Sequence, residues 1–304
     1  MLRPFLFLAL LATIAASAFR PPQTRGRPLV LFVHGRGMQG RDTAALRAMW
    51  RDALDSGATG FTHGPLVQDR DVRLVWYADV LDEASGASCD YAPSDPRARR
   101  DAAEDDGLKS FVSLVGSVLD GFSAAASDSD ARSTLRSLAA DAVFLSDAHK
   151  RCAAEARLAD ALDRARAEAR PVVVVAHSLG SIVAYDYLSA LRDSGLVQTL
   201  VTVGSPLGSP DLRHLLIGGG DGDTLTALRA VGTWINVRND GDPLATDVRP
   251  ARDVEVQTPA DEPDPHELVG YLREKETAAA VLGAWCGAFR ADAPAACDRI
   301  PTPQ

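Results

Sequence analysis

The fold is decided by the stretch Pro171-Val-Val-Val-Val-Ala-His-Ser-Leu-Gly-Ser-Ile-Val-Ala-Tyr185. Val172–Val175 is a β-branched run without polar alternation, which predicts a strand buried on both faces, as in a parallel sheet. From Gly180 to about Arg192, apolar residues recur on one helical face and predict an amphipathic helix. Strand and helix are so close in sequence that Ser178 should occupy the tip of a tight turn, with its side chain exposed.

Strand and helix patterns alternate along most of the chain. We expect strands near 28–34, 72–77, 172–175, 197–203, 232–238 and 253–258, and helices near 42–54, 180–192, 211–217 and 267–288. This alternation predicts an α/β fold with a mostly parallel sheet and helices on both faces. Neither an internal repeat nor a linker divides residues 19–304, so we interpret them as one domain.

Residues 82–169 form an insertion that a minimal βαβ arrangement would not need. Leu108 to Phe122 has the periodicity of a strongly amphipathic helix, and two further helices are expected at about 134–146 and 151–169. A helical insertion of this size either caps a site or enlarges the scaffold, and both interpretations stay open.

The amino terminus has the pattern of a secretory signal peptide. Arg3 precedes an apolar stretch from Phe5 to Ala16, and Ala16-Ser17-Ala18 is a small-x-small cleavage site. We therefore expect residues 1–18 to be removed and the protein to be exported, to a periplasm or the medium. The apolar run is short for a membrane span, and an uncleaved N-terminal anchor is the alternative.

Composition and charge exclude some classes of function. The chain has 304 residues, 46% of them hydrophobic and 24% charged, as is ordinary for a soluble globular protein. Its formal net charge of -9 argues against nucleic-acid binding, because no excess of cations is available to displace phosphate counterions. It also disfavours adhesion to anionic membranes, and no integral membrane span is expected after cleavage of the signal peptide.

The four cysteines suit an oxidising compartment. Their spacing matches no zinc pattern, so metal ligation is not expected. Three pairings are formally open, and we favour Cys286 with Cys297, which are close in sequence. Cys89 with Cys152 would then bridge the insertion.

The turn resembles the nucleophile elbow of the α/β-hydrolases, in particular lipase- and esterase-like serine hydrolases. Ala176-His-Ser-Leu-Gly180 matches the family pattern Gly-x-Ser-x-Gly, with Ala176 in place of the first Gly. An earlier strand ends in His34-Gly-Arg-Gly37, as in that family. The resemblance covers most of residues 28–289 except the insertion, and it implies that Ser178 is a nucleophile.

The resemblance also implies an acid and a histidine downstream, in that chain order. Asp242 matches the family's acid because it lies beyond a strand end and precedes Pro243, while Asp240 is the competitor. Both could also be simple turn formers. His266, at the start of the closing helix, matches the base. We do not expect His177 to contribute, since neighbours around a turn point apart, and we expect His34 to shape its loop.

Family members stabilise an oxyanion with two backbone N–H groups. By resemblance these are the amides of Leu179 and Arg36. The Arg36 side chain could face the pocket and favour an anionic substrate, or point to solvent, which we prefer.

The sequence therefore predicts an exported serine hydrolase that cleaves carboxylic esters of a small molecule or lipid, without cofactor or metal. The same triad could serve an acyltransferase, a thioesterase or an amidase. A catalytically silent binding protein on this scaffold is the alternative from a different class.

Overall fold

The computed structural model describes residues 26–81, 140–141, 143–145, 147–192, 195–213, 215–216, 224–257, 264–289 and 292–301. The predicted signal peptide, Cys89 and the predicted helix at 108–122 lie outside these ranges. Of the insertion, the described part is mainly one long helix, α5 (Ala148–Ala167).

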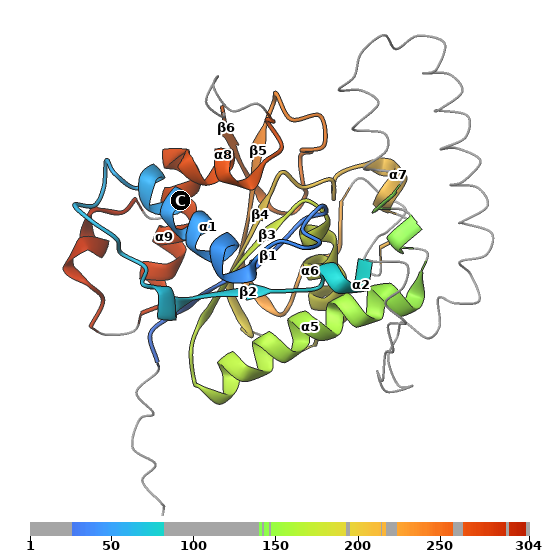
Figure 1. Cartoon of the computed structure of the whole chain (residues 1–304), viewed down its shortest axis with the longest axis horizontal. Coiled ribbons are helices and arrows are strands. Elements are labelled where there is room, and N and C mark those ends of the chain that lie inside the picture. The colour runs from blue at the N-terminus through green and yellow to red at the C-terminus, as the bar shows by residue number, and fades with distance from the viewer. Residues whose placement is uncertain are drawn as a thin grey trace, which may run out of the picture.

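The described residues form an α/β fold around a six-stranded sheet, as predicted (Figure 1). Its strands are β1 (Leu29–Val33), β2 (Val72–Val75), β3 (Val172–His177), β4 (Val197–Val203), β5 (Val231–Asn239) and β6 (Arg252–Val256). They lie in the order β2-β1-β3-β4-β5-β6, and every neighbouring pair is parallel. Every residue of β1 and of β3 is buried, because helices cover both faces of the sheet.

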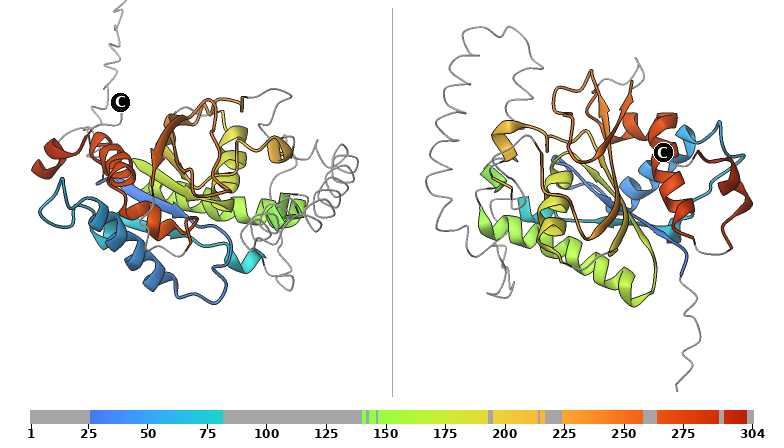
Figure 2. Two further views of the ribbon diagram at one scale, coloured as in Figure 1. Left: turned by 90° about the horizontal axis from the view of Figure 1, so that it is seen from above. Right: turned by 180° about the vertical axis from the view of Figure 1, so that it is seen from behind.

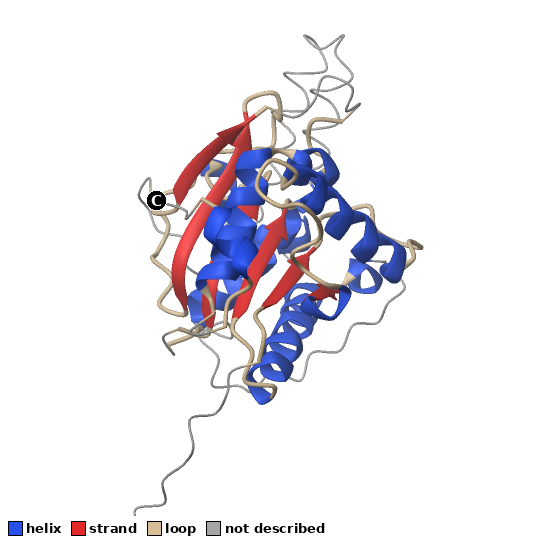
Figure 3. Ribbon diagram, turned by 90° about the vertical axis from the view of Figure 1, so that its left-hand side faces the viewer, coloured by secondary structure: helices blue, strands red, loops and turns tan. Residues whose placement is uncertain are grey.

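Two helical layers enclose this sheet (Figures 2 and 3). One face packs against α1 (Thr43–Gly57), α8 (Leu268–Arg273) and α9 (Lys275–Gly287), and the other against α5 and α6 (Leu179–Ala190). Successive β1 residues alternate between the two cores: Val30 and Phe32 contact the first, Leu31 and Val33 the second. Shorter elements are η1 (Asp69–Asp71), α2 (Ala78–Leu81), α7 (Pro210–Arg213) and η3 (Ala295–Arg299).

The strand order reverses direction at β1. The chain runs from β1 outward to β2, and then crosses back to β3 on the other side of β1. In open parallel sheets the loops leaving two such strands diverge, and a crevice for ligands forms at their carboxyl ends. The loop after β1 and the turn after β3 therefore border the place where a site is expected, and Ser178 lies in that turn.

The prediction of one closing helix at 267–288 is wrong in one respect, because the structure has two helices there. Glu274 has extended backbone (φ -73°, ψ 134°) and separates α8 from α9. Because of this break, α8 packs against α1 while α9 packs against the sheet. Helical periodicity in the sequence does not reveal the break, because the apolar pattern continues through it.

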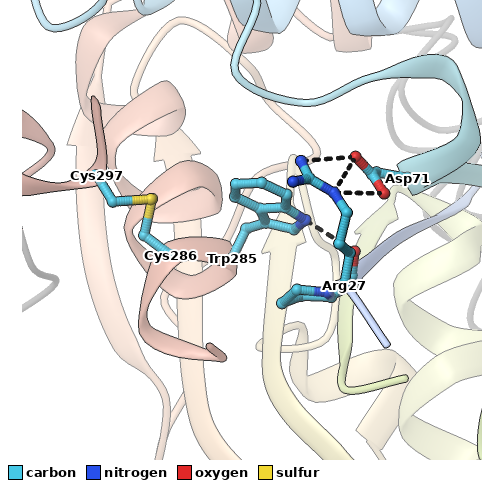
Figure 4. Close-up of a disulfide and its surroundings, with 6 residues drawn as sticks. Arg27, Asp71, Trp285, Cys286 and Cys297 are labelled. Carbon is cyan, nitrogen blue, oxygen red and sulfur yellow. Dashed lines mark hydrogen bonds and ion pairs between the residues drawn. A yellow bond between two sulfur atoms is a disulfide. The ribbon is translucent and has the colours of Figure 1, made fainter. Parts of the chain in front are cut away.

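The predicted disulfide between Cys286 and Cys297 is present and joins α9 to η3 (Figure 4). The adjacent Trp285 donates its indole N–H to the Pro28 carbonyl at 2.9 Å, so α9 is tied to the start of β1. In the other predicted pair, Cys152 lies in α5 and is disulfide-bonded, while Cys89 is outside the described residues.

A buried carboxylate joins segments at the amino-terminal end of the sheet. Asp71, 1% exposed, accepts hydrogen bonds from Arg27 on both oxygens, the shortest at 3.1 Å on Oδ2 (Figure 4). Its Oδ1 also accepts from Arg170 at 3.1 Å. The Arg27 guanidinium also lies over the Trp285 ring, 5.2 Å from its centroid. Asp71 therefore compensates two cations that precede β1 and β3.

We expect Asp71→Asn to lower the free energy of unfolding by about 3 kcal/mol, because it removes the charge that two partly buried guanidinium groups share. The matched control is Asp69→Asn two residues earlier, whose ion pairs are at the surface and which should cost less than about 1 kcal/mol. Urea unfolding of both variants measures the difference. Equal losses would contradict the structural role of Asp71.

Candidate active site

The turn between β3 and α6 holds Ser178 in an unusual backbone conformation. Its φ is 52° and its ψ is -125°, and its N–H donates to the Val203 carbonyl at 3.1 Å. A non-glycine residue with positive φ is strained, and such residues persist where the surrounding structure fixes them, often at functional sites. The predicted strand-turn-helix is thus confirmed, with Ser178 at its tip.

Two glycines allow this turn to contact the loop after β1. A Cβ on Gly180 would lie 2.4 Å from the Val33 carbonyl oxygen and 2.5 Å from that of His34, so no side chain fits there. A Cβ on Gly35 would lie 3.0 Å from the Cβ of Ser178. The start of α6 and the end of β1 are therefore in direct contact. Ala176 is a strand residue, and its methyl group is fully buried in the core beneath the turn.

Ser178, His266 and Asp242 are connected by hydrogen bonds. His266 Nε2 lies 2.8 Å from Ser178 Oγ, and His266 Nδ1 lies 2.7 Å from Asp242 Oδ2. Because a carboxylate only accepts, Nδ1 carries the proton, and Nε2 is left to accept from the serine hydroxyl. Ser178 is only 8% exposed, so the predicted exposure of its side chain is wrong. The imidazole lies against its hydroxyl.

The two candidate acids have different surroundings. Asp242 is 2% exposed and accepts from His266, while Asp240 pairs with Arg238 and its side chain is 65% exposed. The structure therefore brings Asp242, and not Asp240, to the imidazole. Gly204, at φ +54°, leaves room for the Asp242–His266 pair: a Cβ there would lie 3.1 Å from Asp242 Oδ2.

The Asp242 carboxylate is ionised despite its burial. Burial raises the pKa of Asp242, but hydrogen bonds from His266, from the Tyr271 hydroxyl at 2.7 Å and from the Leu244 amide at 2.9 Å together hold it below the usual carboxyl range. The donor from Tyr271 is not evident from the sequence.

Of the two expected oxyanion donors, Leu179 follows Ser178 in the chain, and Arg36 lies in the loop after β1 that contacts Ser178. Leu179 provides the first N–H of α6, which has no carbonyl partner four residues earlier within the helix. Arg36 follows Gly35, whose backbone is against Ser178. Our expectation that the Arg36 side chain points to solvent is wrong. Its guanidinium is paired with Asp141, which is 2% exposed, and donates to the Ala140 carbonyl.

Because of this ion pair, the Arg36 side chain gives no reason to expect a preference for an anionic substrate. The Arg36 charge is already compensated by a buried carboxylate from the insertion. The side chain therefore connects the loop after β1 to the insertion.

His177 contributes to the site, contrary to our expectation. Its ring lies 4.8 Å from that of His266, and its Nε2 donates to the His266 carbonyl at 2.7 Å. Burial lowers the pKa of His177 to about 3, so the ring is neutral. A residue next to the turn tip can reach His266 because His266 packs against the end of β3.

His34 shapes its loop, as predicted. It stacks on Tyr77 with ring centroids 4.1 Å apart, accepts from the Tyr77 amide at Nε2 and contacts the Gly35 carbonyl through Nδ1 at 2.7 Å. Burial lowers the pKa of His34 to about 4, which keeps the ring neutral.

Comparisons with known proteins give no relative with which to compare this site. No protein-family model, curated protein sequence or solved structure matches the chain. Within the described residues there is no group of three or more His, Cys, Asp or Glu side chains arranged to hold a metal ion. In the same part of the chain, we find no helix with the length and apolar character to span a membrane.

The two neutral histidines predict a pH-dependent stability. Both pKa values are depressed in the fold, so the stabilisation is complete above the unfolded value near 6.5 and is lost as the pH falls from there toward about 4 for His34 and about 3 for His177. Between pH 7 and pH 5 each should remove about 2 kcal/mol from the free energy of unfolding.

Urea unfolding at the two pH values tests this. His34→Gln should reduce the loss by about half, whatever its effect at pH 7, whereas His63→Gln at an exposed position should leave it unchanged. An unaltered pH dependence in His34→Gln would contradict a neutral, buried His34.

Proposed function

We propose that the chain is an exported serine hydrolase of the α/β-hydrolase type that cleaves carboxylic esters of small molecules or lipids. The observation that carries this proposal is the hydrogen-bonded series from Ser178 through His266 to Asp242, with Ser178 in strained backbone at the carboxyl end of a parallel strand. The relative order Ser, Asp, His, with the last two after β5 and β6, supports the α/β-hydrolase fold.

In the proposed reaction, Ser178 Oγ attacks the ester carbonyl carbon while its proton moves to His266 Nε2. Asp242 holds the protonated Nδ1 side of the ring and stabilises the imidazolium that forms. The Leu179 and Arg36 amides would donate to the oxyanion of the tetrahedral intermediate. His266 then protonates the leaving alcohol, and a water molecule, deprotonated by the same imidazole, hydrolyses the acyl-enzyme.

Export is supported by the Cys286–Cys297 disulfide, since disulfides persist mainly in oxidising compartments. It agrees with the signal-peptide pattern of residues 1–18, which lie outside the described residues.

Active-site labelling tests the nucleophile. A fluorophosphonate should modify the wild-type protein at one residue, because the hydroxyl of Ser178 transfers its proton to His266 as it attacks phosphorus. Ser178→Ala should abolish the labelling, while Ser189→Ala, at a serine near the end of α6, should retain it. Labelling that persists in Ser178→Ala, or is absent from the wild type, would contradict the proposal.

A pair of carboxylate variants tests the acid. Asp242→Asn should lower kcat for a short-chain p-nitrophenyl ester by roughly 10³-fold or more, because the amide disturbs the tautomer and the charge that the imidazole needs. Asp240→Asn should remain within about twofold of wild type, since its side chain is at the surface beside Arg238. Reversed effects would assign the acid to Asp240.

A further inference from the structure

Asp242 Oδ2 accepts two hydrogen bonds rather than one. His266 Nδ1 reaches it at 2.7 Å, and the hydroxyl of Tyr271 reaches the same oxygen at 2.7 Å. The other oxygen, Oδ1, accepts from the Leu244 amide at 2.9 Å. Three donors from three segments thus fix the plane of one carboxylate.

Tyr271 is suited to this contact by its place in the fold. It lies in α8, five residues after His266, and is fully buried in the core that α1, α8 and α9 share. Burial and the charge of Asp242 raise the pKa of its hydroxyl well above the usual tyrosine value. It therefore stays protonated and acts only as a donor toward the carboxylate throughout the working pH range.

We propose that Tyr271 is a positioning residue of the triad, whose hydroxyl holds the Asp242 carboxylate in the orientation that aligns His266 with Ser178. This inference rests on the proposed function and adds a fourth side chain to it. Among the described residues no hydrogen bond joins this hydroxyl to Ser178 or His266, so its effect on them passes through Asp242; the hydroxyl also contacts the Asn239 backbone.

Removing the hydroxyl should have two consequences. The carboxylate loses one of its three donors and can rotate, so the imidazole spends less time aligned with Ser178 Oγ. In addition, one hydrogen bond fewer stabilises the negative charge of the carboxylate. The carboxylate therefore attracts the protonated imidazole more strongly. The first effect lowers kcat, and the second moves the acid limb of the pH profile to higher pH.

Other titratable groups face this pair from neighbouring elements. The ring of His177 in β3 lies against the imidazole. Arg238 of β5 interacts electrostatically with Tyr271, and Asp141 of the insertion interacts electrostatically with His266. Each retains its place when one hydroxyl is removed. A shift of the pH profile between wild type and Tyr271→Phe therefore measures the effect of removing that hydroxyl.

The experiment compares Tyr271→Phe with Tyr185→Phe in the full chain. Tyr185 is equally buried, in α6, and its hydroxyl donates to the Thr226 carbonyl at 3.3 Å, away from the triad. For a p-nitrophenyl ester we expect Tyr271→Phe to lower kcat about tenfold, with KM within twofold and the acid limb of kcat/KM displaced upward by about half a pH unit. Tyr185→Phe should change none of these.

A double-mutant comparison separates positioning from packing. If the hydroxyl acts through Asp242, Tyr271→Phe should cost nothing more in an Asp242→Asn background. An equal, additive loss in both backgrounds, or an unchanged kcat and pH profile, would overturn the proposal.

Failure of the proposed function can be distinguished from failure of the proposal for Tyr271. If wild type hydrolyses no ester and binds no fluorophosphonate, an NMR titration of the labelled imidazole of His266 still tests the contact. An upward shift of its midpoint in Tyr271→Phe, relative to Tyr185→Phe, supports the role of the hydroxyl in holding Asp242. Identical midpoints would refute it.

Discussion

The close contact between the first turn of α6 and the end of β1 determines the geometry of the whole site. At residue 180 the backbone of α6 approaches the carbonyl oxygens of Val33 and His34 so closely that only glycine fits. This contact fixes where the helix starts, and Ser178 must take a positive φ to connect β3 to it. The same contact brings the loop after β1 against Ser178. The strained serine is thus a consequence of how tightly strand and helix pack.

Most other polar groups of the site are paired by hydrogen bonds, and His177 Nδ1 is a buried exception. Asp242 has donors on both oxygens, His266 is bonded through both nitrogens and through its carbonyl, and His34 bridges Tyr77 to the loop after β1. Buried polar networks stabilise one arrangement only when their members are paired, because an unpaired group in a low-dielectric interior is costly. This explains how a site with several ionisable groups can lie beneath the surface.

Much of this could be predicted from the sequence because the signals are local. The Val-rich run, Ser178 and Gly180 specify strand, turn and helix within a few residues, and Asp242 follows its strand end at a distance from which it can reach inward. Other features could not be predicted because they depend on tertiary packing. The pattern of α8 does not show that Tyr271 faces Asp242, nothing near Arg36 indicates Asp141 more than a hundred residues later, and the break at Glu274 leaves the apolar periodicity intact.

In the proposed reaction Ser178 attacks a carbonyl whose oxygen lies between two backbone amides, and a crystal structure of the phosphonylated protein would show this arrangement directly. Phosphorus should be bonded to Ser178 Oγ, with a phosphoryl oxygen within hydrogen-bond distance of the amides of Leu179 and Arg36. An adduct on another residue, or a phosphoryl oxygen that points away from both amides, would refute the proposed reaction.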